Sequence, residues 1–277
     1  QSRSSAASDV YKRQVDATGR MQVTALESEL DRLQDQKRPC LAVVATAGTT
    51  VRGAIDPLQA LADVCRERSL WLHVDGAIGA VFGLCESTAS LLDGIASADS
   101  ITVNPQKLLG IAKTSSLLLV RDQTALQETF HTGLPYMEPA LTGVHGGELG
   151  LQGSRSAEIL KLWLGLRQLG EDGIASLLEQ ALVRRDRLER HLDRSWLDIT
   201  SGPLHLLACT PLGADAERSA RWSTSMRQRL LDQQIMVSRP LHHGRHHIKV
   251  VLGNPHTSEA LIDRLGTLLN DTSEEVL

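Results

Sequence analysis

Aromatic side chains are scarce in this sequence of 277 residues, at 3% of the total. A hydrophobic core must therefore consist of aliphatic side chains and alanine, which fits a hydrophobic fraction of 42%. The chain also lacks a surplus of basic residues, since its formal net charge is −4. This argues against a nucleic-acid-binding protein, which usually carries a basic surface. No apolar run approaches the roughly 18 residues that a membrane-spanning helix needs. The composition is that of an ordinary globular chain.

Cysteine is also rare, and its spacing excludes the common cysteine-based sites. The sequence has four cysteines and no CxxC pair, so neither a zinc ribbon nor a dithiol redox centre is indicated. We expect reduced, mostly buried thiols in a cytoplasmic protein. The four are Cys40, Cys65, Cys85 and Cys209.

Four histidines near the C-terminus form a cluster with the composition of a metal site, because histidine is a common metal ligand. The cluster lies in a glycine-containing connection without an acid or a cysteine at ligand spacing. We therefore expect a solvated turn and predict no metal site. The cluster comprises His242, His243, His246 and His247.

The first residues differ from the rest of the chain. They are rich in Ser, Ala, Gln and Arg, show no periodicity and lack the apolar region of a signal peptide. Residues 9–14, DVYKRQ, resemble the translation of a transposon sequencing adapter. We expect residues 1–14 to be a non-native scar or a disordered terminus, and the natural sequence to begin in mid-domain.

Short apolar runs alternate with helical periodicity over residues 15–155. The alternation predicts a mostly parallel sheet with right-handed crossovers. The wholly apolar run at 40–45 is typical of a strand buried on both faces. Thr24 and Glu27 suggest a capping box, and Asp56 suggests an N-cap followed by proline at the first helical position. The expected strands are 40–45, 70–74, 100–103 and 115–120, and the expected helices are 23–36, 57–68 and 88–96.

The pattern changes after residue 121. A long glycine-rich loop is expected over 130–153, and loops of this length are often functional. Amphipathic helices at 156–169 and 173–192 are expected to connect the large domain to a small C-terminal α/β domain. We therefore predict a partial large domain (15–155), linking helices (156–195) and a small domain (196–277). Within the last, strands are expected at 197–202, 204–210, 235–240 and 247–253, with one helix through Arg229 and one through Leu269.

Three short motifs follow successive strands of the predicted sheet. They are TAGTT (46–50), HVDGA (73–77) and VNPQK (103–107). Ligands of open α/β sheets bind outside the carboxyl ends of the strands, so a hydroxyl-rich turn, an acid and a lysine are expected at one edge. An enzyme that uses pyridoxal 5'-phosphate (PLP) needs these groups: a lysine amine that holds the cofactor, and an acid that pairs with the pyridine nitrogen.

Together these motifs resemble the group II PLP-dependent decarboxylases, which include aromatic-amino-acid, glutamate and cysteine-sulfinate decarboxylases. The resembling segments are VATAGTTVRGAIDPLQALADVC, LWLHVDGA and ADSITVNPQKLLG, in this order and at the family's spacing. A single HVDGA would be a weak signal, whereas three motifs in register are specific. The resemblance implies fold type I of the PLP enzymes.

The resemblance also implies roles for individual residues. Lys107 resembles the lysine that carries PLP as a Schiff base, and Asp75 the partner of the pyridinium nitrogen. Tyr136 corresponds to a mobile-loop tyrosine that is thought to return a proton to the substrate carbon after CO2 leaves. The other expected cofactor-binding positions are Thr50, His73, Ala77, Asn104, Gln106 and Gly153.

Some positions depart from the family pattern. Gln106 stands where histidine is common, so an acid–base role there is in doubt, and Lys249 stands where arginine is common. The histidine that stacks on the cofactor and the main phosphate-binding loop should precede Ala42 and are not in this chain. We therefore expect this chain alone to bind PLP poorly and to be inactive by itself.

The resemblance favours PLP-dependent decarboxylation of an L-amino acid to an amine by a homodimer. Two other possibilities remain open. One is another lyase or an aldehyde-forming decarboxylase on the same fold, and the other is a non-catalytic interaction protein built on this fold.

Overall fold

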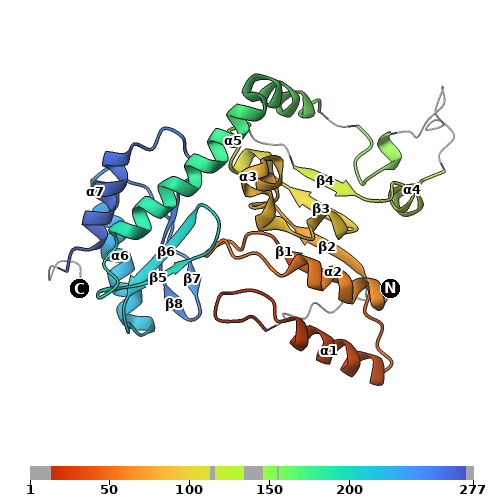
Figure 1. Ribbon diagram of the computed structural model, residues 1–277, viewed down its shortest axis with the longest axis horizontal. Helices are drawn as coiled ribbons and strands as arrows, with labels where there is room; N and C mark the ends of the chain where they lie inside the picture. The colour runs from red at the N-terminus through yellow and green to blue at the C-terminus, as the bar shows by residue number, and fades with distance from the viewer. Residues whose placement is uncertain (1–13, 113–115, 134–145, 155, 273–277) are drawn as a thin grey trace, which may run out of the picture.

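The computed structural model describes residues 14–112, 116–133, 146–154 and 156–272. The described chain forms two larger sheets joined by one long helix, and a small two-stranded sheet (Figure 1). The first sheet and its helices contain the three motifs, and the second sheet lies in the C-terminal part. The mixed α/β architecture agrees with the predicted fold class.

The first sheet has the strand order β1-β2-β3-β4. The first three strands are parallel, and β4 is antiparallel to β3. The strands are β1 (Ala42–Thr46), β2 (Trp71–Asp75), β3 (Ser100–Val103) and β4 (Leu117–Val120). All four lie where the sequence predicts a strand.

Only one face of this sheet is covered by the described residues. In β1, Val43 and Ala45 are buried while Val44 is 55% exposed, and in β2 Trp71 is 37% exposed. The prediction that β1 is buried on both faces is therefore wrong. We call the uncovered side the open face of the sheet.

Two predicted helix starts are corrected by the structure. Helix α1 (Val23–Asp35) begins after Gln22, so Thr24 lies inside the helix and makes no capping bond. Helix α2 (Leu58–Glu67) has Pro57 at its N-cap, and no side chain caps it. The buried Asp56 carboxylate instead accepts hydrogen bonds from the Met21 and Thr46 N–H groups, both at 2.7 Å. Asp56 therefore fastens the segment before α1 to the end of β1.

The helix predicted at 88–96 is broken into short pieces. Gly94 has φ +91°, and a Cβ there would lie 2.3 Å from the Gln59 backbone nitrogen. The close approach to α2 requires glycine in a left-handed conformation, which interrupts a helix. The pieces are α3 (Glu86–Ala89), η2 (Ser90–Leu92) and η3 (Ile95–Ser97), and a further short 3₁₀ helix, η1 (Ala80–Leu84), precedes them.

Helical segments lie before the predicted long loop and within its last part. Helix α4 (Thr124–Phe130) precedes it, and η6 (Gly146–Glu148) lies near its end. Glu148 Oε1 accepts bonds from the Thr132 hydroxyl (2.8 Å) and the Thr132 N–H (3.0 Å). These bonds, with His131 at 2.9 Å from Oε2, lower the pKa of Glu148 to about 2.

Helix α5 (Ile159–His191) joins the two halves and combines both predicted linking helices. Gly170 has non-helical angles (φ 64°, ψ −178°), so the chain kinks where the sequence predicts a break. Leu178 of α5 packs in the core of the first sheet, and Leu188 packs in the core of the second. One helix thus sets the position of both cores (Figure 1).

The second sheet is antiparallel with the order β5-β6-β9. Residues 235–240 do not form the predicted strand and pair with β9 only at Ser238. Pro240 cannot donate to a ladder, and a short hairpin, β7 with β8, follows it. The remaining elements are β5 (Leu197–Ser201), β6 (Leu206–Pro211), α6 (Ala216–Asp232), β7 (Leu241–His242), β8 (Arg245–His246), β9 (Ile248–Val251) and α7 (Glu259–Leu269).

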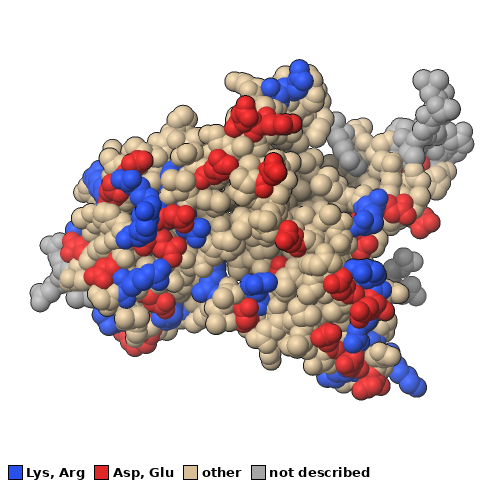
Figure 2. Space-filling view, in the orientation of Figure 1, with Lys and Arg blue, Asp and Glu red and all other residues tan. Residues whose placement is uncertain are grey.

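Charged side chains of both signs are interspersed on the face of the molecule seen in Figure 2. They gather over α1 and α2 and over the C-terminal helices, without a patch of one sign. Within the described chain, no helix combines the length and the apolar character that crossing a membrane requires.

Replacing Asp56 by alanine is expected to destabilise the fold by about 2–4 kcal/mol, because two buried N–H groups lose a charged acceptor. Urea unfolding monitored by circular dichroism measures this change. Asp93→Ala is the control, since Asp93 is exposed and a surface change of this kind is worth about 0.5 kcal/mol or less. Equal midpoints for the two variants would contradict the role of Asp56.

Candidate active site

The parallel pairing of β1, β2 and β3 brings the three motifs to one edge of the sheet. Thr46 pairs with Asp75, and Asp75 pairs with Thr102. Paired residues of neighbouring strands project from the same face, so the three side chains stand in a row on the open face. The turn that carries Lys107 begins directly after β3.

Lys107 is the last residue of a short 3₁₀ helix, η4 (Pro105–Lys107). Its backbone N–H donates to the Asn104 carbonyl at 3.0 Å. Pro105 before it and Leu108 and Leu109 after it are buried, while Lys107 itself is exposed. The buried neighbours hold the turn firmly, so the amine of Lys107 is presented from a rigid base.

Asp75 ends β2 with its carboxylate exposed. Its Oδ1 accepts a bond from the Ala77 N–H at 3.1 Å, within the turn that follows the strand. A Cβ at Gly76 would lie 2.5 Å from Ala80 Cβ and 2.9 Å from the Thr102 carbonyl oxygen. Glycine is therefore required for this turn to pack closely, and the turn orients the acid.

His73 lies on the open face two residues before Asp75. Its Nδ1 is 2.8 Å from Ser100 Oγ, and its Nε2 is 3.2 Å from Thr102 Oγ1. Both ring nitrogens therefore have partners on β3.

The other predicted cofactor-binding residues differ in their burial and in their hydrogen bonds. Gln106, beside Lys107, has a buried Oε1 without a hydrogen-bond partner. Asn104 Oδ1 accepts a long bond from the Ser116 hydroxyl at 3.4 Å. Ala77 is half-buried in the turn after Asp75, Thr50 is exposed, and a Cβ at Gly153 would meet no atom within 4 Å. Tyr136 lies outside the described residues.

A group of two buried basic side chains beside Lys249 was missed by the sequence reasoning. Burial and the proximity of Lys107 lower the pKa of Lys249, on β9. Burial also lowers the pKa of Arg184, on α5. Burial, with Lys249 and Arg184 nearby, lowers the pKa of His205 to about 4. A histidine and an arginine far apart in the sequence carry no motif that could have revealed this group.

Hydrogen bonds and packing join this group to both sheets. Arg184 Nε donates to the Leu252 carbonyl at 2.9 Å, and the Leu252 N–H donates to the His205 carbonyl at 3.0 Å. The His205 ring stacks on Phe82, with 5.8 Å between centroids and 30° between planes. Phe82 follows the HVDGA motif, so this contact links the C-terminal sheet to the candidate site.

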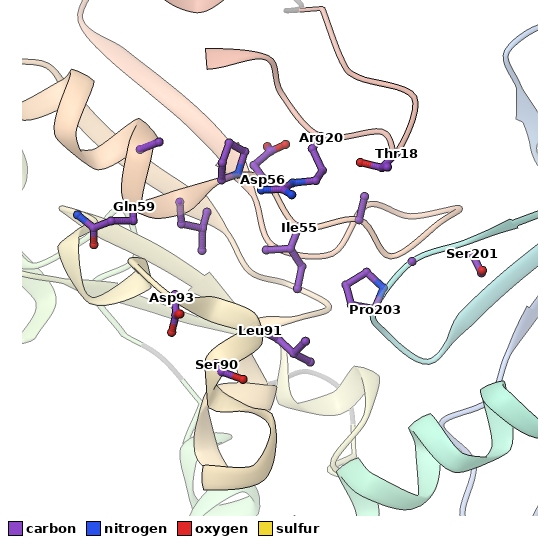
Figure 3. Close-up of a pocket in the computed structure, with 15 residues that line it drawn as sticks. Thr18, Arg20, Ile55, Asp56, Gln59, Ser90, Leu91, Asp93, Ser201 and Pro203 are labelled. Atoms are coloured by element: carbon purple, nitrogen blue, oxygen red, sulfur yellow. The ribbon is translucent and has the colours of Figure 1, made fainter. Parts of the chain in front are cut away.

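A cavity of about 670 Å³ lies elsewhere in the molecule (Figure 3). It is lined by the segment before α1, the start of α2, η2 and the β5–β6 turn, with Arg20, Asp56 and Asp93 among its polar groups. Neither Lys107 nor Asp75 lines it. Since it contains no amine that could bind an aldehyde covalently, it does not suit PLP.

The four histidines near the C-terminus form a hairpin that is partly buried. His243 and Gly244 form its turn with positive φ, but His247 is only 1% exposed. Burial, with the neighbouring histidines, lowers the pKa of His242 to about 4. The expected solvated turn is thus only half correct. Among the described residues, no group of His, Cys, Asp and Glu side chains has the geometry of a metal site.

Comparison with known proteins shows what this chain resembles. Residues 3–195 match the family model described as the pyridoxal-dependent decarboxylase conserved domain. An aromatic-L-amino-acid decarboxylase of Bacillus atrophaeus is 33% identical over 196 residues, which cover 68% of this chain and 40% of that protein. An L-2,4-diaminobutyrate decarboxylase of Rhizobium meliloti (strain 1021) is 32% identical over 275 residues, which cover 94% of this chain and 54% of that protein.

A solved structure has the same fold. The crystal structure of mouse CSAD in its apo form superimposes with a TM-score of 0.82 at 30% identity, covering 93% of this chain and 57% of that chain. The chain spans about half the length of the curated relatives it matches.

Acidification is expected to destabilise the fold partly through His205. Its folded pKa of about 4 lies below the ordinary value of 6.5. As the pH falls below 6.5, the unfolded chain binds a proton before the folded chain does, so stability is lost between about pH 6.5 and 4. The total loss is roughly 2–4 kcal/mol. His205→Leu should flatten the dependence of unfolding free energy on pH in this window, and an unchanged slope would contradict the assignment.

Proposed function

This chain belongs to the family of pyridoxal-dependent decarboxylases, and we propose that it supplies the lysine and the acid of an amino-acid decarboxylase active site. The observation that carries the proposal is the common sheet edge of Lys107 and Asp75. The amine of Lys107 is exposed on a rigid turn after β3, and the carboxylate of Asp75 is exposed at the end of the neighbouring β2.

The residues at this edge fit PLP by their chemistry. Lys107 would hold the aldehyde carbon through its Nζ, and Asp75 would pair with the ring nitrogen in a charge-assisted hydrogen bond. The buried Oε1 of Gln106 has no partner, and a buried acceptor without a donor is costly. A polar group bound beside Lys107 would relieve this cost. Asn104 and Gly153 would lie toward the phosphate.

When bound, PLP supplies an electron sink for the bond between the α-carbon and the carboxylate of the substrate. Asp75 contributes a fixed negative charge that favours a protonated ring nitrogen. Lys107 would hold the cofactor, and once the substrate amine takes its place the lysine amine would be available to carry a proton. Tyr136, which follows α4 in the sequence, would return a proton to the α-carbon, and the product would then be an amine.

Lys249 provides a positive charge for the substrate carboxylate. It is half-buried, its charge lies near that of Lys107, and no acid among the described residues forms an ion pair with it. A second cation at this place costs free energy unless an anion offsets it. The α-carboxylate of an amino acid is such an anion, and holding it also orients the bond to be broken.

Two further parts of the proposal concern the whole enzyme. We place the large domain at 15–155, the linking helices at 156–195 and the small domain at 196–277, because the two hydrophobic cores follow this division except for α5, which joins them, and Leu204, which packs in the first core. We also propose that the enzyme is a cytoplasmic homodimer, as the family resemblance implies.

Lys107→Ala is expected to lower PLP-dependent decarboxylation by at least about 10²-fold, because the lysine both holds the cofactor and carries protons. Borohydride reduction of the whole enzyme after PLP loading, followed by peptide mass spectrometry, should locate the pyridoxyl group on Lys107. Lys37→Ala is the control, since Lys37 is exposed after α1. Both changes are made in the whole enzyme.

The same assay separates the alternatives. An aldehyde instead of an amine as the product would favour an aldehyde-forming decarboxylase. Absence of a pyridoxyl label on Lys107, together with unchanged behaviour of Lys107→Ala, would favour a non-catalytic protein.

Lys249→Met is expected to raise KM for the amino acid about tenfold or more, because a charged hydrogen bond to the carboxylate is lost. Lys249→Arg keeps the charge and should retain KM within about threefold. Steady-state kinetics on the PLP-loaded enzyme measures both. Equal KM values for Lys249→Met and the unchanged enzyme would exclude this role.

A further inference from the structure

Four side chains on the open face of the first sheet form a hydrogen-bonded chain that ends beside Asp75. The Trp71 indole Nε1 donates to Ser100 Oγ at 2.8 Å. Ser100 Oγ is also 2.8 Å from His73 Nδ1. His73 Nε2 is 3.2 Å from Thr102 Oγ1. Thr102 is the register partner of Asp75 on the neighbouring strand.

The donor and the acceptor of each hydrogen bond in this row of side chains follow from which groups carry a proton to donate. An indole N–H can only donate, so Ser100 Oγ accepts from Trp71. Ser100 is buried, with 6% of its surface exposed, and its hydroxyl proton therefore needs an acceptor. His73 Nδ1 is the acceptor within reach, so it carries no proton. The neutral ring then bears its proton on Nε2 and donates to Thr102 Oγ1.

The consequence for Thr102 is that its oxygen is used as an acceptor, and its own proton has no acceptor among the described residues. Neighbouring strands lie about 4.7–4.9 Å apart, and Thr102 and Asp75 are register partners on one face of the sheet, so a bond between the hydroxyl and the carboxylate is within reach. Asp75 already accepts at Oδ1 from the Ala77 N–H. A donor from Thr102 would hold the carboxylate from its other side.

We propose that the Trp71–Ser100–His73–Thr102 chain is a positioning device for Asp75. It fixes the tautomer of His73 so that the Thr102 hydroxyl is available to donate to the Asp75 carboxylate. His73 is then a positioning residue whose ring nitrogens face β3, and it acts on the cofactor only through Thr102 and Asp75. The effect of these side chains on the cofactor rests on the proposed function, whereas the assignment of the His73 tautomer does not depend on it.

The first test is independent of PLP. Nitrogen-15 NMR of histidine-labelled protein distinguishes a ring protonated at Nε2 from one protonated at Nδ1. At neutral pH the His73 signal is expected to show the Nε2-protonated form. Ser100→Ala removes the hydroxyl donor to Nδ1 and is expected to shift this signal. An Nδ1-protonated His73 in the unchanged protein would overturn the proposal whether or not the protein is a decarboxylase.

The second test uses the PLP-loaded enzyme and a matched pair of variants. Thr102→Val keeps the shape but removes the hydroxyl, and it is expected to weaken PLP binding and lower kcat, each about tenfold. The pH midpoint of the visible absorbance of the bound cofactor should also shift, while KM stays within about twofold. Thr102→Ser restores the hydroxyl and should recover most of the affinity and the original midpoint.

Thr224→Val is the control, since Thr224 is an exposed residue of α6 whose hydroxyl bonds only within its own helix. It should match the unchanged enzyme in every measurement. Thr102→Val with unchanged affinity and midpoint, or Thr102→Ser as defective as Thr102→Val, would overturn the proposal. Failure of the whole enzyme to bind PLP would count against the proposed function, and the tautomer of His73 would still decide whether these side chains act as proposed.

Discussion

The in-register parallel pairing of β1, β2 and β3 is the constraint on which the site depends. It places Thr46, Asp75 and Thr102 side by side and makes the chain leave all three strands at the same edge. Side chains of a strand alternate between faces, so a slip of one residue would turn Asp75 toward the core. The buried residues of the covered face, such as Ala45 and Val74 at 0% exposure, oppose such a slip. The hydrophobic core thus determines the orientation of the acid.

Helix α5 is the second element that the arrangement requires. It contributes Leu178 to one core and Leu188 to the other, and Arg184 between them bonds to the Leu252 carbonyl. This brings the end of β9, and with it Lys249, close to Lys107. Burying Arg184 and Lys249 opposes folding, as their lowered pKa values indicate, and burial keeps the neighbouring His205 uncharged at neutral pH. Apolar packing, including the stacking of His205 on Phe82, offsets this cost.

A polar side chain often has more than one possible partner, and a sequence pattern does not show which one it takes. Asp56 precedes α2 and has the composition of an N-cap, yet it bonds to backbone groups of two distant segments. The ring nitrogens of His73 face Ser100 and Thr102, and its expected role toward a cofactor stays a prediction. A local pattern cannot reveal these choices, because each is decided by the free energy of contacts between segments far apart in the chain.

The sequence by itself determined the strands of the first sheet, the order of the three motifs and the residue types at the end of each of these strands. Apolar runs bounded by turn residues are local signals, and the lysine and the acid are recognisable from their spacing. Only the tertiary structure decided which face of the sheet stays open, that β4 runs antiparallel and that Lys249 lies near Lys107. These features depend on packing and on backbone pairing between distant segments. The order of residues along the chain specifies such contacts only through the folded state.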